Sequence, residues 1–341
     1  MNKVLYVFSL LLLFSCGNAD VDENQPDYCQ YVDPFIGTGG HGHNYPGVTM
    51  PFGMVKLSPD TRLTGWDGCG GYHYSDSIVY GFSHTHLSGT GVSDYGDILL
   101  MPTVGEVSVN NSDYSSKYSH EKESASPGYY SVVLDDYNIK AELTASRRVG
   151  VHKYTYPASE ASNIIIDLYH RDSVLNSYLK IVNNTEIEGF RKSTNWALNM
   201  QWYFVAQFSK PFKSHGLALN NSLNNEVTEL EGKNIKGYLQ FATEQNEEII
   251  VKVGISAVSI EGARKNLEET EGLSFEQIKA NAQKEWKTQL AKIEVEGGTN
   301  RQKRNFYTSL YHSMVTPDLY MDIDGQYRGM DNQIHKADNF E

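Results

Sequence analysis

Between residues 28 and 260 the chain is a succession of short β-branched and aromatic runs, separated by clusters of glycine, asparagine, proline and serine. Such runs predict β-strands. Long helical patterns do not alternate with them, which argues against the βαβ units of a parallel sheet. We therefore expect a mainly β fold, a large antiparallel β-sandwich. The predicted strands lie in residues 97–109, 129–143, 149–156, 163–168, 203–208 and 248–259.

The pattern becomes helical near the C-terminus. Ser274 and Gln277 have the spacing of a capping box, and apolar residues follow at helical intervals up to the Gly297-Gly298 pair. Thr299 and Gln302 repeat the cap spacing before a second helical pattern. Two helices are therefore predicted, one on each side of the glycine pair.

These patterns divide the chain into a sandwich at residues 28–262, a helical linker at 263–298 and the start of a helical domain at 299–341. A first helix cannot bury its apolar face alone. We therefore expect the chain to be the truncated N-terminal portion of a longer protein.

The first residues resemble a targeting segment. A short basic start precedes an apolar run that is too short to span a bilayer, and Leu-Phe-Ser-Cys at positions 13–16 resembles a bacterial lipobox. We predict a lipoprotein signal at 1–16, lipidation of Cys16 and a flexible tether at 17–27. The alternative is an ordinary secretory signal that is cut near Ala19. An exported, lipid-anchored protein in the periplasm or at the outer-membrane surface is expected, with the membrane as a partner.

Charge and cysteine content limit the class of protein further. The net charge of -13 and the pI near 5.3 argue against a nucleic-acid partner, because phosphate binding needs a basic surface. Outside the cytoplasm Cys29 and Cys69 have two possible states, a disulfide or two buried thiols.

Residues 33–102 are rich in Gly, His, Asp and aromatic residues and hold five histidines, which predicts a segment that builds a site. His41 and His43, like His84 and His86, are two residues apart. On a strand such pairs face the same side, as a zinc site requires. Neither pair has a Cys or Glu at a known zinc spacing, so hydrogen-bonding or structural roles rank ahead of zinc and no metal ligand is assigned.

Four aspartates in this segment also invite interpretation as acid–base residues: Asp67, Asp76, Asp94 and Asp97. We expect instead that Asp94 and Asp97 fix the neighbouring Ser-Gly-Thr-Gly turn through bonds to its backbone. The Gly-x-Gly sequences are not a phosphate-binding loop, because no helical pattern follows them.

Several motifs together carry a resemblance to a known family. They are DPFIGTGG from Asp33, PFGMV from Pro51, GYHYSD from Gly71 and FSHTHLSGTG from Phe82, with EGFR from Glu188 further along. The chain from about Tyr31 to its end resembles glycoside hydrolase family 92, which consists of bacterial calcium-dependent exo-α-mannosidases.

The resemblance implies a β-sandwich packed on an (α/α)6 barrel with the active site between them. It places the catalytic glutamate and aspartate, and most calcium ligands, beyond Glu341, so no catalytic residue is expected in this chain. The implied reaction is inverting release of terminal mannose, most readily from α-1,2 linkages, in N-glycan or mannan degradation. The substrate would be a mannose-containing glycan, and the chain alone would be inactive.

The resemblance also assigns substrate-binding residues. Trp66 lies between glycines and is expected on a loop, where it would stack on the sugar beyond the scissile bond. The alternative is a tryptophan that fills the domain interface. The predicted substrate-binding set is Trp66, Asp67, Gly39, Gly40, His84 and His86, while Gly37, Gly89 and Gly91 would allow close approach to the sugar or barrel.

Two other functions compete with the hydrolase. A stand-alone carbohydrate-binding sandwich would need the β domain to be stable and to bind mannose without a barrel. A peptide-N-glycan amidase ranks below both, because the matching segment holds no Cys/His/Asp triad.

Overall fold

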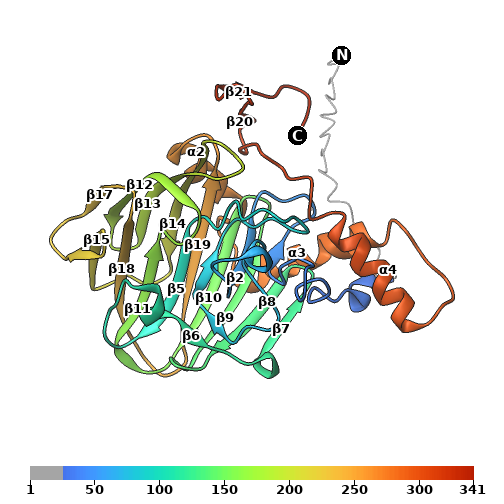
Figure 1. The fold of residues 1–341 in the computed structure, drawn as a ribbon, viewed down its shortest axis with the longest axis horizontal. Helices are drawn as coiled ribbons and strands as arrows, with labels where there is room; N and C mark the ends of the chain where they lie inside the picture. Colours follow the sequence, from blue (N-terminus) through green and yellow to red (C-terminus); the bar gives the residue numbers. More distant parts are fainter. Residues whose placement is uncertain (1–25) are drawn as a thin grey trace, which may run out of the picture.

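The protein is described by a computed structural model that covers residues 26–341, and the predicted signal segment with Cys16 lies outside these residues. Two large antiparallel sheets lie face to face, and helices pack at one end and on the outer side of one sheet (Figure 1). The predicted antiparallel sandwich, followed by helices, is confirmed. Within the described residues, no helix is both long and apolar enough to span a membrane.

The smaller of the two sheets has eight strands. Their order across the sheet is β1 (Val48–Thr49), β2 (Lys56–Asp60), β4 (Gly81–Ser83), β5 (Leu99–Val104), β11 (Ser159–Asp167), β18 (Ile235–Thr243), β15 (Ser214–Leu219) and β16 (Ser222–Asn224).

The larger sheet has nine strands. Their order is β17 (Glu229–Gly232), β12 (Ser173–Asn183), β13 (Glu186–Thr194), β14 (Met200–Phe208), β19 (Glu247–Ser256), β10 (Val149–Tyr156), β9 (Ile139–Ala145), β8 (Tyr129–Leu134) and β7 (Glu123–Ser126). Two short pairs complete the strands, β3 (Ile78–Val79) with β6 (Ser116–Lys117), and β20 (Gln326–Arg328) with β21 (Ile334–Lys336).

Strand β10 is buried on both faces, and its sequence alternates accordingly. His152, Tyr154 and neighbouring inward residues lie in the core between the sheets, whereas Val149 and Val151 join a second apolar cluster with the helices. Successive strand residues face opposite sides. The alternation of valine with larger inward side chains therefore serves two different packing surfaces.

Four α-helices and four short 3-10 segments accompany the strands in the described residues. The helices are α1 (Asn111–Tyr114), α2 (Ile260–Asn266), α3 (Phe275–Leu290) and α4 (Asn300–His312), and the 3-10 segments are η1 (Tyr28–Tyr31), η2 (Trp66–Gly68), η3 (His120–Lys122) and η4 (Leu267–Thr270). Helices α2 and α3 cover the outer face of the nine-stranded sheet.

Both predicted capping boxes are confirmed. The Ser274 side chain accepts from the Gln277 amide at the start of α3, and Thr299 accepts from Gln302 at the start of α4. In each box the glutamine side chain bonds back to the backbone of the cap residue. The helices therefore begin where local side-chain chemistry satisfies their free amide groups. The predicted end of the first helix was wrong, because α3 ends at Leu290 and not at the Gly297-Gly298 pair.

The predicted strands differ from the observed ones where turns and mixed polarity intervene. The run 129–143 forms two strands, because a turn at Asn138, with φ of 51°, joins β8 to β9. Strands β12 and β13 were not predicted, since polar residues occupy inward positions that usually hold apolar ones. Arg191 and Ser193 on β13 are both buried.

The two cysteines of the described residues, Cys29 and Cys69, are free thiols. The Cys69 thiol donates to the Thr90 carbonyl at 3.0 Å, and burial raises the pKa of Cys29 to about 12. Of the two states left open by the sequence, the structure has the unpaired one.

Trp286 joins helix α3 to the sandwich. Its indole is fully buried, its Nε1 donates to the Thr49 carbonyl at 2.8 Å, and its ring centroid lies 4.5 Å from that of Tyr311 in α4. This one side chain of α3 therefore contacts both strand β1 and helix α4.

We predict that Trp286→Ala lowers the free energy of unfolding by about 3–5 kcal/mol, the usual cost of deleting a buried aromatic ring. Trp286→Phe keeps most of the packing but leaves the Thr49 carbonyl unpaired, so its cost is about 1–3 kcal/mol. Trp196, which is 81% exposed, provides the control, since Trp196→Ala should change stability by less than about 0.5 kcal/mol. Urea titrations measure all three, and equal midpoints for Trp286→Ala and Trp196→Ala would contradict the assignment.

Candidate functional site

Three loops form the candidate site, and we call them the three-loop face: residues 37–44 before strand β1, residues 64–71 after β2 and residues 88–92 after β4. They hold most of the predicted sugar-binding residues. Trp66 is 61% exposed, Gly39 and Gly40 are exposed, and Asp67 is half-buried. The segment that the sequence identified as site-building therefore reaches the surface at these loops.

Hydrogen bonds join loop 37–44 to loop 88–92. The Gly89 amide donates to the His43 carbonyl at 3.1 Å, and the Ser88 hydroxyl donates to the Asn44 side chain at 2.9 Å. Loop 37–44 is itself tightly folded, because a Cβ atom at Gly42 would lie 2.1 Å from the Gly37 carbonyl oxygen. A side chain at position 42 would therefore force this loop open.

The Trp66 indole lies against Gly91. A Cβ atom at Gly91 would lie 2.1 Å from the indole ring, so only glycine permits this position of the ring. The edge of the ring meets His43, with centroids 5.1 Å apart and planes at 79°. Trp66 is thus placed by one residue from each of the other two loops and still presents much of its surface to solvent.

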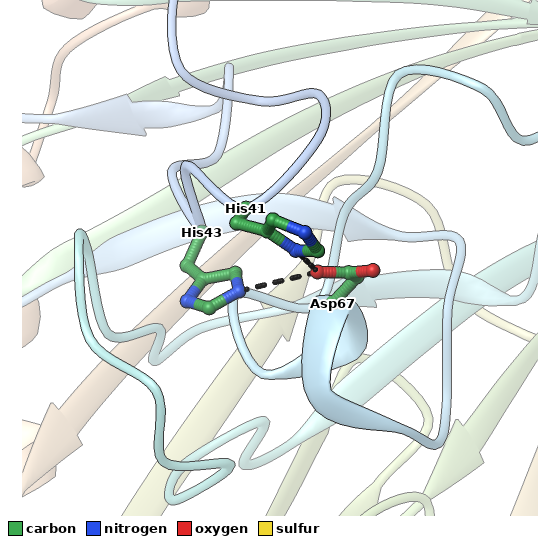
Figure 2. A group of neighbouring side chains, drawn as sticks. All are labelled: His41, His43 and Asp67. Carbon is green, nitrogen blue, oxygen red and sulfur yellow. Dashed lines mark hydrogen bonds and ion pairs between the residues drawn. The ribbon is translucent and has the colours of Figure 1, made fainter.

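His41, His43 and Asp67 converge, as Figure 2 shows. They lie beside Trp66, which directly precedes Asp67 and meets the His43 ring. The Nδ1 atom of His41 lies 2.6 Å from Asp67 Oδ1, and Nε2 of His43 lies 3.5 Å from the same oxygen. The hydrogen bond from His41 is the largest of the effects that lower the pKa of Asp67. The three side chains form a group of possible metal ligands within 4.8 Å of one another.

His84 and His86 lie elsewhere, and both are completely buried. The Nδ1 atom of His84 bonds to the Ile98 carbonyl at 2.6 Å, and that of His86 bonds to the Lys56 carbonyl at 2.8 Å. The His86 ring lies beneath loop 64–71, where a Cβ atom at Gly71 would be 2.8 Å from its Cδ2 atom, and neither ring is exposed on the three-loop face. The burial favours the structural alternative over the expected sugar contact, because the polar segment continues inward as a hydrogen-bonded core.

His84 belongs to a directed chain of hydrogen bonds. The Tyr154 hydroxyl lies 2.8 Å from Nδ1 of His152, whose Nε2 lies 3.0 Å from Nε2 of His84. With His84 donating to the Ile98 carbonyl, each link has one donor and one acceptor when both imidazoles are neutral, with Tyr154 donating to His152 and His152 donating to His84. Burial is the main reason that the pKa of His84 is lowered to about 4 and that of His152 lies well below its usual range.

Asp94 and Asp97 do not fix the Ser-Gly-Thr-Gly turn, and that prediction was wrong. Asp94 accepts from the Ala197 amide at 2.9 Å, and Asp97 accepts from the Thr85 hydroxyl at 2.7 Å and from the Arg191 guanidinium. These partners are distant in the sequence and reach the two aspartates only in the folded protein, so the neighbouring sequence does not reveal them.

Buried arginines support the three-loop face from beneath, and the sequence interpretation missed this role. Arg191 donates to the carbonyls of Leu168 and Arg171, and Arg171 donates in turn to the carbonyls of Gly68 and Cys69 at 3.0 and 3.1 Å. These last two residues directly follow Trp66 and Asp67. An arginine at an inward position of a strand is the one sequence signal that points to such support.

Asp60 supplies the negative charge beside Arg171. Its carboxylate lies 3.6 Å from the Arg171 guanidinium and 3.2 Å from Nε2 of His86, and it is completely buried. Burial alone raises the pKa of Asp60, but His86 and His170 outweigh it and hold the pKa well below its usual range. Asp60 therefore remains ionised and balances the buried arginine.

Comparison with protein families matches almost the whole described chain. The model of the glycosyl hydrolase family 92 N-terminal domain matches residues 31–256, and that of the family's catalytic domain matches residues 262–341.

Solved structures show the same similarity. A family GH92 α-mannosidase from Bacteroides thetaiotaomicron, solved with mannoimidazole, is 39% identical with a TM-score of 0.89 over 92% of this chain and 43% of its own. An inverting family GH92 mannosidase from the same species is 26% identical, with a TM-score of 0.83 over 93% of this chain and 44% of its own.

A curated relative, an uncharacterised secreted glycosidase of Arthroderma benhamiae, is 27% identical over 92% of this chain and 44% of its own length. The fold and these matches place the chain in a class of proteins that consists of glycoside hydrolases. The chain belongs to glycosyl hydrolase family 92. It spans less than half the length of the relatives that it matches.

We predict that acid weakens the fold through the His84–His152 pair. The folded pKa of His84, about 4, lies below the unfolded value of about 6.5, so the unfolded state binds more protons between these values. The stabilisation is complete above about pH 6.5 and is lost as the pH falls towards 4, with a slope of up to about 1.4 kcal/mol per pH unit for each histidine.

Urea titrations between pH 7.5 and 5 measure this slope. His84→Gln should flatten it, whereas His335→Ala, which changes a half-exposed histidine, should leave it unchanged. Stability that does not vary between pH 7 and 5, or an unchanged slope in His84→Gln, would refute the prediction.

Proposed function

We propose that this chain forms the sugar-binding half of a calcium-dependent exo-α-mannosidase, and that Trp66 stacks on the glycan beyond the bond that is cleaved. The observation that carries the proposal is the match over 92% of the chain to a solved α-mannosidase at 39% identity. Release of terminal mannose from α-1,2 linkages, in N-glycan or mannan degradation, is the reaction that we propose for the complete enzyme.

The geometry of Trp66 supports the role in sugar binding. Its indole is exposed, yet Gly91 beneath it and His43 at its edge hold the ring in one orientation. A preoriented aromatic face loses little freedom when it binds the apolar face of a pyranose. Asp67 and the exposed backbone of Gly39 and Gly40 offer hydrogen-bonding groups on the same three-loop face.

In this proposal the acid and base of an inverting hydrolysis belong to the complete enzyme and not to residues 26–341. Such a pair stands roughly 6.5–9.5 Å apart so that a water molecule fits between the base and the sugar. The inverting family member with 26% identity supports this stereochemistry.

Most of the calcium ligands would lie outside the described residues. Calcium requires six to eight oxygen ligands. Within residues 26–341 the group of possible metal ligands found among His, Cys, Asp and Glu is His41, His43 and Asp67, which offers two nitrogens and one carboxylate. This donor set does not suit calcium, so none of these residues is assigned to it.

Export and a lipid anchor on Cys16 complete the proposal. The curated relative described as secreted supports export. The Leu-Phe-Ser-Cys sequence at the end of the apolar run is the reason to propose lipidation, with the protein in the periplasm or at the outer-membrane surface.

Matches to the catalytic-domain model over residues 262–341 favour the hydrolase over a stand-alone carbohydrate-binding module. Sugar binding by this chain without any hydrolysis would instead support the binding module.

We expect sugar binding to depend on Trp66 and on its contact with Gly91. Trp66→Ala should abolish the binding of α-1,2-mannobiose in calorimetry, and Trp66→Phe should retain part of it. Gly91→Ala should behave like Trp66→Ala, because φ at Gly91 is not positive and the added methyl acts only by displacing the indole. No heat at millimolar mannobiose in the unchanged protein, or full binding by Trp66→Ala, would exclude the proposed contact.

We also expect that purified protein restricted to residues 26–341 releases no measurable phenol from an aryl α-mannoside in the presence of calcium. The physical reason is that the proposed acid and base are not among these residues. Colorimetric turnover assays measure this, with Trp66→Ala run beside the unchanged protein to detect contamination. Turnover that copurifies with the chain and responds to its substitution would overturn the assignment.

A further inference from the structure

Three side chains from two loops of the three-loop face form a set of possible metal ligands, of which the proposed function uses Asp67 alone. His41 and His43 come from loop 37–44, and Asp67 comes from loop 64–71 at the start of η2. The sequence interpretation gave zinc a low rank because no third ligand accompanied the two histidines. Folding brings Asp67, which is 24 positions after His43 in the sequence, to both rings, and Figure 2 shows both imidazoles turned towards its carboxylate.

The distances are close to those that a metal ion imposes. Zinc–ligand bonds of about 2.0–2.1 Å in tetrahedral geometry set neighbouring ligand atoms about 3.3 Å apart. The observed separations from Asp67 Oδ1 are 2.6 Å to His41 and 3.5 Å to His43, and all ligand atoms lie within 4.8 Å of one another. The His41 side chain is 79% exposed, so its ring can rotate to close the remaining difference.

A second and independent observation is the state of the His43 ring. Only 7% of His43 is accessible to solvent. Its Nε2 atom points at Asp67 but has no hydrogen-bond partner. An unpaired buried polar atom costs about 1–3 kcal/mol. A metal ion between His43 and Asp67 would satisfy this nitrogen.

The backbone at His43 is also held in an uncommon conformation. Its φ is 57°, in the left-handed region that residues other than glycine seldom adopt. The Gly89 amide fixes the His43 carbonyl, and the close packing of Gly42 fixes the preceding turn. The ring is therefore held in position by its own loop and does not depend on Asp67 for its orientation.

The donor set selects among metals. Imidazole nitrogens suit zinc and other first-row transition metals, whereas calcium prefers oxygen. Three protein ligands with one exposed member leave at least one coordination position for water or for a ligand from solvent.

We propose that His41, His43 and Asp67 form a zinc-binding site that ties loop 37–44 to the loop that carries Trp66. Because Asp67 directly follows Trp66 and His43 meets the indole edge, the metal would restrict the motion of the tryptophan. The metal would act by positioning Trp66, and this inference goes beyond the proposed function. Its test does not depend on mannosidase activity.

The experiment uses tag-free protein that has been stripped with a chelator and then titrated with Zn²⁺ in a calorimeter. We expect uptake of one equivalent that excess Ca²⁺ does not displace. His43→Ala and Asp67→Asn should each weaken zinc binding by at least about tenfold, since even loss of an outer partner of a metal ligand has an effect of 10–100-fold. Asp67→Asn keeps the size of the side chain and protects the test against misfolding of the His43 variant.

A matched control is available in the described chain. His335 and Asp331 form a surface pair 3.0 Å apart without a third ligand, so His335→Ala should leave zinc uptake unchanged. Co²⁺ gives a second readout, because it should quench the emission of Trp66 in the unchanged protein and lose most of this effect in Trp66→Phe. Absence of stoichiometric zinc uptake, or uptake that survives both His43→Ala and Asp67→Asn, would overturn the proposal.

Discussion

The buried guanidinium of Arg191 is the constraint on which the candidate site depends. It is completely inaccessible to solvent, so its charge and its donors must be satisfied inside the protein. Asp97 supplies the opposite charge, and the carbonyls of Leu168 and Arg171 accept its remaining donors. This set of bonds fixes the segment that follows β11 against strand β13 of the other sheet.

The segment that follows β11 connects this buried charge to the loop with Trp66. Arg171 extends from it to the carbonyls of Gly68 and Cys69, and Asp60 balances its charge. The loop with Trp66 and Asp67 therefore rests on a buried polar network, whereas an apolar core would leave its carbonyls unpaired. The exposed indole is consequently well placed although it lies on a loop, where precise positions are otherwise hard to maintain. The same argument explains why the histidines at 84 and 86 lie inside: they complete the polar core beneath the site.

Local chemistry made a large part of the fold predictable. Both helix caps were correctly identified, because a capping box involves residues only three positions apart. The antiparallel sandwich followed from the succession of strand runs. Prediction failed at β12 and β13, where Arg191 and other polar residues occupy inward positions and conceal the apolar alternation. It also failed for the partners of Asp94 and Asp97, since Ala197 and Arg191 are distant in sequence.

The sequence by itself determined the class of fold, the residues at which α3 and α4 begin and the segment that carries the site, because propensity, capping and motif chemistry are properties of neighbouring residues. Only the tertiary structure decided which members of that segment reach the surface. Two histidine pairs with the same spacing lie in different environments. His84 and His86 are completely buried in the core, while His41 and His43 contact Asp67 beside Trp66. The physical reason is that burial and ligand convergence depend on how loops from different parts of the chain pack on the sandwich, and spacing along the chain carries no information about that.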